Sequence, residues 1–264
     1  MTMKTSSKLT RAVRRAAVFA LALASAACVP APEAAQGPRS TLFIGIDVSG
    51  SFRSQGRFDD AVAFVSHYIH AHLNGYGGLE VPRALFVGPI GGDVPGEPHA
   101  FRPIHDFMGK EPAEIEADLR NWLKPRDRYT DFSAFFERAA TLAKRQNLVL
   151  APITLVVLSD GEPDLGRGGA EAQDSFAAYK AINLEPLEYL SRNVTVRLLY
   201  ADPAVAVRWE RYVPRSRVRL WTVDRVVMAG WHEQLKPELA PADQAALWKW
   251  VKDIVDFRVR RSII

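Results

Sequence analysis

Five oxygen-bearing side chains in three separate segments of the sequence could together hold a metal ion. They are Asp47, Ser49, Ser51, Thr130 and Asp160. The set offers two carboxylates and three hydroxyls, and it contains no histidine and no cysteine. Such hard oxygen ligands suit Mg²⁺, Ca²⁺ or Mn²⁺ rather than zinc. The residue types therefore predict a divalent-cation site, provided that the fold brings the three segments together.

Each segment also has an ordinary structural explanation when it is taken alone, because Asp, Ser and Thr are common at helix N-termini and in turns. Their positions in the chain favour a shared functional site. Asp47 follows the apolar run 42–46, and Asp160 comes just after the apolar run 153–158. Thr130 precedes a stretch of helical periodicity. In an open parallel sheet, ligands gather beyond the carboxyl ends of the strands, so we expect the three segments to meet there.

The rest of the chain alternates apolar runs of strand length with longer stretches of helical periodicity. The expected strands are 42–46, 84–87, 101–104 as an edge strand, 153–158, 194–200 and 218–223, and the expected helices are 58–73, 112–123, 131–145, 172–190 and 242–257. Parallel strands need long crossovers, which such helices provide. The sequence thus predicts a single α/β domain over residues 41–257, with a doubly wound, mostly parallel sheet and helices on both faces.

The three polar segments resemble the three parts of the metal-ion-dependent adhesion site of von Willebrand factor A domains. The first is Asp-Val-Ser-Gly-Ser at 47–51, the second is Thr-Asp-Phe-Ser-Ala-Phe-Phe-Glu-Arg-Ala at 130–139, and the third is Leu-Ser-Asp-Gly at 158–161. Their order, spacing and strand context agree with that family. Tyr129 stands where a small residue often precedes the threonine, and Ser159 stands where threonine is common. Neither departure removes a ligand atom.

The resemblance implies a cation-dependent binding protein and assigns no residue a catalytic role. Ser49, Ser51 and Thr130 would coordinate the ion directly or through water. Asp47 and Asp160 would supply negative charge, often through bridging waters. The expected ion is Mg²⁺, with Ca²⁺ and Mn²⁺ as alternatives. An open coordination position would accept a Glu or Asp carboxylate from a partner protein.

Two other interpretations of the same residues stay open from the sequence. Asp47 could be the nucleophile of a magnesium-dependent aspartyl-phosphate hydrolase of the haloacid dehalogenase type, with Asp160 and Asp164 as metal carboxylates. The motif of those enzymes has a second aspartate two residues after the nucleophile, where this chain has Ser49. The other alternative is a von Willebrand factor A scaffold with a non-functional metal site.

The first 27 residues have the pattern of an export signal. Five basic residues and no acidic one occur in this segment, and the apolar run 16–27 ends it. That run is shorter than the roughly 20 residues that a membrane-spanning helix needs, so residues 1–27 are expected to be a signal peptide. The single cysteine of the chain, Cys28, follows Ser-Ala-Ala, which resembles a bacterial lipobox.

A lipid on Cys28 would anchor the protein in the cell envelope, facing the periplasm, with the outer membrane favoured by Val29. Without the lipid, a soluble periplasmic protein is expected. Residues 28–40 are rich in Pro and Ala and predict a tether. Residues 258–264 are expected to form a C-terminal tail.

The charge of the chain argues against nucleic acid as a partner. The whole sequence has 34 basic and 30 acidic residues and a formal charge of +4. Since five of the basic residues lie in segment 1–27, the remainder has 29 basic and 30 acidic residues. A nearly neutral protein is not expected to attract polyanions.

Three histidines, His67, His70 and His72, lie near the end of the expected helix 58–73. The residue four positions after His67 is Ala71, so the usual helical pair of metal-binding histidines is missing. Because imidazolium is favourable near a helix C-terminus, these side chains are expected to face solvent.

Overall fold

The computed structural model describes residues 39–54, 56–92, 99–123, 129–163, 176–191 and 193–257. The expected signal peptide, Cys28, most of the expected tether and the tail 258–264 lie outside the described residues. Among the helices that are described, none is both long enough and apolar enough to cross a membrane.

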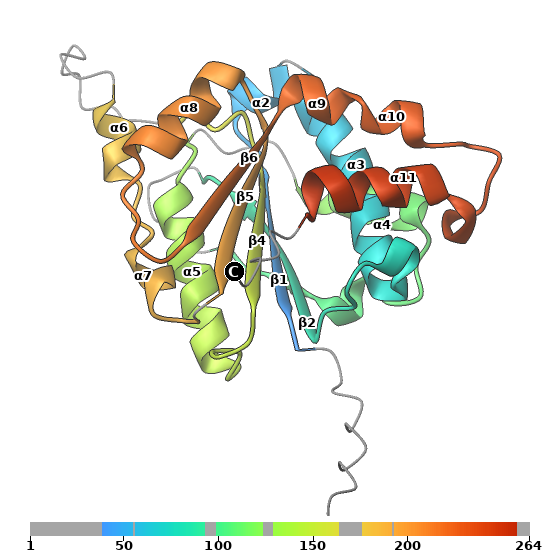
Figure 1. Ribbon diagram of the computed structural model, residues 1–264, viewed down its shortest axis with the longest axis horizontal. Helices are drawn as coiled ribbons and strands as arrows, with labels where there is room; N and C mark the ends of the chain where they lie inside the picture. The colour runs from blue at the N-terminus through green and yellow to red at the C-terminus, as the bar shows by residue number, and fades with distance from the viewer. Residues whose placement is uncertain are drawn as a thin grey trace, which may run out of the picture. The chain divides into compact units, whose positions relative to one another are not determined.

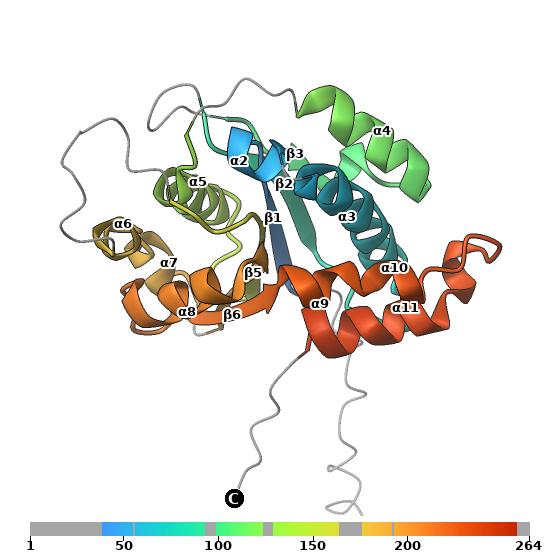
Figure 2. The same ribbon diagram turned by 90° about the horizontal axis from the view of Figure 1, so that it is seen from above.

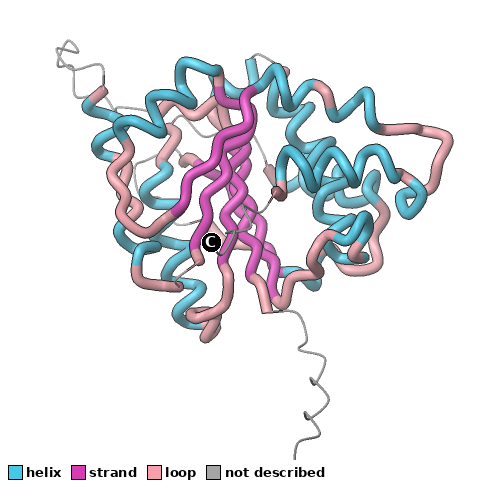
Figure 3. Tube along the Cα trace, in the orientation of Figure 1, coloured by secondary structure: helices cyan, strands magenta, loops and turns pink. Residues whose placement is uncertain are grey.

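A six-stranded sheet in the order β3-β2-β1-β4-β5-β6 forms the centre of the domain (Figure 1; Figure 3). The strands are β1 (Thr41–Asp47), β2 (Ala84–Ile90), β3 (Arg102–Pro103), β4 (Ile153–Leu158), β5 (Val194–Ala201) and β6 (Arg219–Asp224). Neighbouring strands are parallel, except that the short edge strand β3 is antiparallel to β2. From β1 the chain first moves outward to β2 and then returns past β1 to β4, so the sheet is doubly wound. The predicted fold class is confirmed.

Helices cover both faces of this sheet (Figure 2). One face carries α3 (Arg57–Asn74), α4 (Pro112–Trp122), α9 (Arg225–Ala229), α10 (Trp231–Gln234) and α11 (Ala245–Trp250), and the other carries α5 (Phe132–Arg145), α6 (Ala177–Ala181), α7 (Glu185–Glu188) and α8 (Pro203–Tyr212). Successive strand residues point to opposite faces, so Phe43 and Ile44 of β1 belong to different cores. The apolar run of β1 is continuous because both of its faces are buried.

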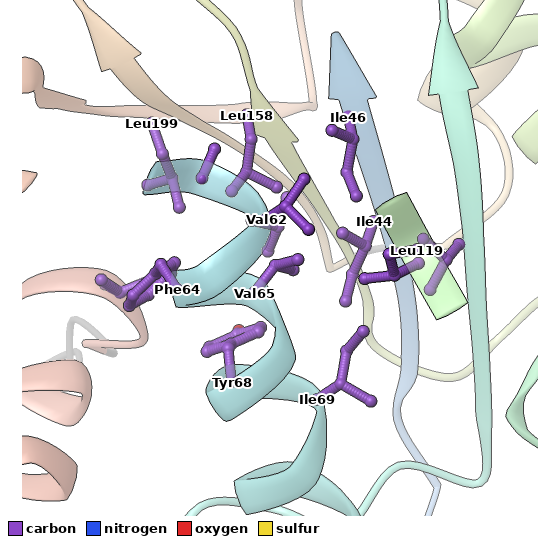
Figure 4. Packing of buried hydrophobic residues seen from close by; sticks show 14 of the residues in the cluster. Ile44, Ile46, Val62, Phe64, Val65, Tyr68, Ile69, Leu119, Leu158 and Leu199 are labelled. Carbon is purple, nitrogen blue, oxygen red and sulfur yellow. The ribbon is translucent and has the colours of Figure 1, made fainter. Parts of the chain in front are cut away.

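The longest helix, α3, packs against the centre of the sheet. Val62, Val65 and Ile69 recur at helical spacing, and the close view shows them directed toward Ile44 of β1 (Figure 4). This packing holds the first turn of α3 near the carboxyl end of β1. The short helix α2 (Gly50–Ser54) fills the connection between the two.

Local signals fix where several helices begin and end. Before α4, the side chains of Glu111 and Glu114 accept each other's backbone N–H in a capping box, with Pro112 at the first helical position. At the C-terminal end of α3, Gly75 takes a left-handed conformation with φ of 67°. A residue with a side chain would adopt this conformation only at a cost in free energy.

The expected helix 172–190 is wrong as a single element. Residues 172–175 lie outside the described residues, and the remainder forms the two short helices α6 and α7. Between them, the Asn183 side chain accepts a hydrogen bond from the N–H of Glu185 at 2.9 Å. Pro186 then starts the second helix, because proline has no N–H to continue the first one. Asparagine and proline together interrupt an otherwise helical pattern.

The expected helix 242–257 is also shorter than predicted. It consists of the 3-10 turn Pro241–Asp243, then α11, and then the π-helical segment Val251–Val255. The sequence did not predict α2, α8, α9 or α10, which have four to ten residues each. The remaining single turns are Tyr76–Gly78 and Ile104–Asp106.

The prediction of solvent-facing histidines is wrong. His70 and His72 are buried, and His67 is partly buried. The Nδ1 atom of His70 lies 2.9 Å from the carbonyl oxygen of Lys110, and Nδ1 of His72 lies 2.8 Å from that of Glu80. His70 and His72 therefore connect α3 to neighbouring loops and do not face solvent.

Candidate functional site

Asp47, the last residue of β1, is the centre of the candidate site. Its side chain is fully buried, and both carboxylate oxygens accept hydrogen bonds. Oδ1 accepts from the backbone N–H of Ser49 at 2.8 Å, and Oδ2 accepts from Oγ of Ser159 at 2.5 Å. The first bond curls the loop after β1, so the serines that follow are turned back toward the carboxylate.

The two serines of this loop come together. Oγ of Ser49 lies 3.2 Å from Oγ of Ser51. Ser49 is buried, whereas Ser51 is exposed on the first turn of α2. Alternating residues thus place two hydroxyls beside one carboxylate, with one of the hydroxyls open to solvent.

Asp160 lies beyond the neighbouring strand β4 and is also buried. The register that pairs Ile46 with Leu158 brings the ends of β1 and β4 side by side. Oδ1 of Asp160 accepts a hydrogen bond of 3.1 Å from the N–H of Glu162, which shapes the turn. Gly161, between them, has φ of 79° and a crowded surrounding, so this turn requires glycine.

The electrostatics of the site are those of two crowded carboxylates. Burial raises the pKa of Asp47 to about 7, and the nearby negative charge of Asp160 adds to the rise, while hydrogen bonds from Ser159 and Ser49 oppose it. Neither aspartate forms an ion pair with a basic residue in the part of the chain that the structure describes. Within the described ranges, no basic side chain of the protein therefore pairs with these two carboxylates.

Thr130 is held at the same edge of the sheet by its neighbours. Tyr129 forms an isolated antiparallel bridge with Gly92, just beyond β2, through backbone bonds of 3.1 and 3.2 Å. On the other side, Phe132 packs edge-on against Trp209 at 4.9 Å between ring centroids, and Trp209 donates to the carbonyl of Gly161 at 2.6 Å. The buried Thr130 thus lies between Tyr129, which is bonded to the end of β2, and Phe132, which packs against the tryptophan that holds the Asp160 loop.

The structure unites these residues to different degrees. Hydrogen bonds connect Asp47 with Ser49, and Ser49 with Ser51. Asp160 acts on Asp47 through its charge. In the described residues, Thr130 makes no hydrogen bond to the other four. The adjacent Asp131 caps α5 by accepting from the N–H of Ala134 at 2.8 Å, which is a structural role.

Residues outside the predicted ligand set support the Asp160 loop. Oε2 of Glu162 accepts a hydrogen bond of 2.7 Å from the Tyr179 hydroxyl, and Arg208 lies 3.6 Å from Oε1 of the same carboxylate. Burial and the nearby Glu162 carboxylate raise the pKa of Tyr179 to about 12, so its hydroxyl stays a donor. Together with Trp209, these side chains tie the loop to α6 and α8.

The donor set fits a hard divalent cation. Two buried carboxylates that have no basic partner in the described part of the chain favour a positive ion, and the hydroxyls of Ser49, Ser51 and Thr130 supply neutral oxygens. No group of three or more His, Cys, Asp and Glu side chains suited to a metal occurs among the described residues. A site on this edge therefore depends on hydroxyl ligands.

Comparisons with known proteins concern the fold. No family model and no curated protein matches the sequence. Among solved structures, the SpRpn10 VWA domain is similar at 12% identity and a TM-score of 0.42, over 78% of this chain and 93% of that chain. The pilus adhesin SpaC from Lactobacillus rhamnosus GG is similar at 13% identity and a TM-score of 0.48, over 83% of this chain and 31% of that chain.

A third similar structure is proximal thread matrix protein 1 from the mussel byssus, described with a zinc-occupied MIDAS motif. The identity is 12% and the TM-score 0.42, over 83% of this chain and 48% of that chain. This chain thus spans less than half the length of the adhesin and of the thread matrix protein. At such low similarity, the function has to be argued from the site of this chain itself.

Proposed function

We propose that this chain is a von Willebrand factor A-like binding protein that holds a divalent cation, Mg²⁺ in the first place, at the carboxyl edge of its sheet. Ser49, Ser51 and Thr130 would bind the ion directly or through water, and Asp47 and Asp160 would contribute their charge through bridging waters. The observation that supports this best is that the buried Asp47, which senses the charge of the buried Asp160, lies beside the neighbouring hydroxyls of Ser49 and Ser51, while no basic side chain of the described residues pairs with either aspartate.

Charge balance indicates how such a site would act. Two carboxylates match the charge of one divalent cation, and the neutral hydroxyls add none, so the ion remains able to attract a further anion. Ser51 is the exposed member of the set, which makes its side the side of approach. An aspartate or glutamate of a partner protein is the ligand that suits this position.

The hydrolase alternative is not favoured by the geometry. A nucleophilic aspartate needs an oxygen that can reach the substrate, but Asp47 has no exposed surface and accepts a hydrogen bond on each oxygen. Asp164, which that mechanism would use as a metal carboxylate, lies outside the described residues. We therefore propose binding, with no catalytic residue.

Export and lipid attachment complete the proposal. Residues 1–27 would be removed, Cys28 would carry lipid, and residues 29–40 could reach about 40 Å at roughly 3.3 Å per residue. The carboxyl edge of the sheet would then be available to a partner in the cell envelope.

Mass spectrometry of the purified mature protein, compared with a Cys28→Ala variant, tests the anchor, because only the unaltered protein should carry the lipid mass.

Calorimetric titration of metal-free protein with Mg²⁺, Ca²⁺ and Mn²⁺ tests the cation site directly. Asp160→Asn should weaken Mg²⁺ binding by about tenfold or more, since it removes one of two charges. The matched control is Asp253→Asn, which changes an exposed aspartate that pairs with Lys249. Undiminished binding by the Asp160 variant would refute the assignment, and absence of binding by the unaltered protein would indicate a non-functional site.

The protein partner is tested by affinity capture from envelope extract. The unaltered protein and the Asp253→Asn control should retain the partner in Mg²⁺ and release it when a chelator is added. Asp160→Asn should fail to capture it in either condition. A partner that stays bound in chelator would show that the interaction does not pass through the cation.

A further inference from the structure

A second candidate site lies at the opposite edge of the sheet, where β4, β5 and β6 begin. A cavity of about 420 Å³ opens there, bounded by Thr154, Thr195, Arg197, Arg219, Trp221 and the segment that follows α11. Thr195 and Arg197 alternate with Val196 and Leu198, which pack into the core on the α5 face. The cavity therefore lies on the other face, beneath the end of α11.

Arg197 is an unusual residue for the middle of an interior strand. It is 5% exposed, and its guanidinium donates to the backbone carbonyls of Val255 and Phe257, the latter at 2.8 Å. It also forms an ion pair with the carboxylate of Asp256, at 3.9 Å. Nε of Arg197 has no partner among the described residues. Because Arg197 and Arg219 share this single carboxylate in the described lining, the cavity favours an additional anion.

The other residues that line the cavity also favour an anion. Arg219 is exposed at the start of β6 and adds a second positive charge, while Thr154, Thr195 and Asn193 can each donate a hydrogen bond. Among the described residues of the lining, Asp256 is the one carboxylate. The cavity thus offers more donors than acceptors and an excess of positive charge.

Two aromatic side chains line part of the cavity. The rings of Trp221 and Phe257 meet edge-to-face with centroids 4.9 Å apart. The Arg197 guanidinium lies 5.5 Å from the centre of the Phe257 ring. A ligand that carries a carboxylate on a planar or short apolar group would satisfy both the cations and these aromatic side chains.

We propose that this cavity binds a small organic carboxylate, with Arg219 and Arg197 attracting the anion and Trp221 contacting its apolar part. The volume lies within the range of small-molecule sites, roughly 300–1,000 Å³. This site is separate from the cation site at the carboxyl edge and does not depend on it.

Benzoate is a suitable probe, and benzamide is its uncharged counterpart of nearly the same shape. The protein, purified as the cell produces it and stripped of metal on a chelating resin, is titrated with each compound by calorimetry. Removing metal beforehand prevents benzoate from binding through a cation. Benzoate should bind about tenfold or more tightly than benzamide, because only benzoate carries the charge.

Variants then locate the binding. Arg219→Gln should weaken benzoate binding by about tenfold, and Trp221→Leu should weaken both compounds. Both residues are at least partly accessible, so these changes leave the core intact, unlike a change at Arg197. The matched control is Arg83→Gln, at the same edge but outside the cavity, which should bind benzoate normally.

The proposal is overturned if benzoate does not bind, or if benzamide binds equally well. It is also overturned if Arg219→Gln binds benzoate as tightly as the Arg83→Gln control. Loss of Mg²⁺ binding in the Asp160→Asn variant has no bearing on these results, since the benzoate titration is done without metal.

Discussion

Oγ of Ser159 donates a hydrogen bond of 2.5 Å to Oδ2 of Asp47, joining the ends of two neighbouring parallel strands. The same Oγ accepts the backbone N–H of Gly161 at 2.9 Å. Because the hydroxyl has one hydrogen to give, its direction is fixed by these two bonds. Ser159 therefore orients the central carboxylate of the proposed cation site and the loop that carries Asp160, without being a proposed ligand.

Ser159→Ala is expected to weaken Mg²⁺ binding by about tenfold and to lower the free energy of unfolding by roughly 1–3 kcal/mol. Loss of the bond frees the Asp47 carboxylate and raises its pKa further, so protons compete better with the cation. Calorimetry and urea unfolding measure the two effects. Ser159→Thr keeps the hydroxyl and should restore binding, and equal binding by the alanine variant would contradict the positioning role.

Much of the fold could be predicted because it follows from apolar runs. The bounds of β4 match the predicted strand 153–158, since a strand buried on both faces has no polar interruption. The first segment of the site was predicted for a related reason: its alternating oxygens follow such a run. The sequence could likewise place Thr130 at a helix start, because the helical period of α5 is clear.

The rest of the site was not predictable because its contacts are distant in sequence. A serine before Asp-Gly is typical of a turn, and only the structure shows that Ser159 meets Asp47, 112 residues earlier. Trp209 lies on α8, a helix of ten residues. The helical periodicity over so few residues was too short for this helix to be predicted from the sequence. The contact of Trp209 with Gly161 depends on how α8 packs beside β5, which local patterns do not encode.

The pH dependence of stability should reveal the buried Asp47. Its pKa is raised from 3.8 to about 7, so the folded state binds this proton more tightly than the unfolded state does. Without metal, its contribution to stability is therefore largest below pH 3.8 and is lost as the pH rises toward 7, by up to roughly 4 kcal/mol. Asp47→Asn should flatten this part of the profile in urea unfolding at several pH values. An unchanged slope would contradict the raised pKa.

Gly161→Ala should damage the site, whereas Gly50→Ala should not. A Cβ on Gly161 would lie 3.0 Å from side-chain carbons of Leu198 and Val205, and the φ of 79° adds strain. We expect a loss of roughly 1–3 kcal/mol and weaker Mg²⁺ binding, because the Asp160 turn must shift. Gly50 is helical with open space around it, so alanine there should leave the melting temperature nearly unchanged. Equal melting temperatures for the two variants would contradict this difference.

Glu188 supplies a test at acidic pH in the opposite direction. Its carboxylate accepts backbone N–H bonds from Ser216, Arg217 and Val218 at 2.7, 2.5 and 3.2 Å. Burial raises its pKa, but these bonds outweigh burial and leave the pKa below its usual 4.5. Its contribution is therefore present above pH 4.5 and is lost as the pH falls through the lowered pKa.

Glu188→Gln should remove this acid sensitivity and cost roughly 1–3 kcal/mol at neutral pH, whereas Glu185→Gln, an exposed neighbour on the same short helix, should change little. Since Asp47 loses its contribution as the pH rises and Glu188 as it falls, these two carboxylates together stabilise metal-free protein most near about pH 4–5. Added Mg²⁺ should shift that maximum toward neutral pH, because the cation replaces the proton on Asp47. If the pH of maximum stability did not change with saturating Mg²⁺, Asp47 would not be part of the proposed cation site.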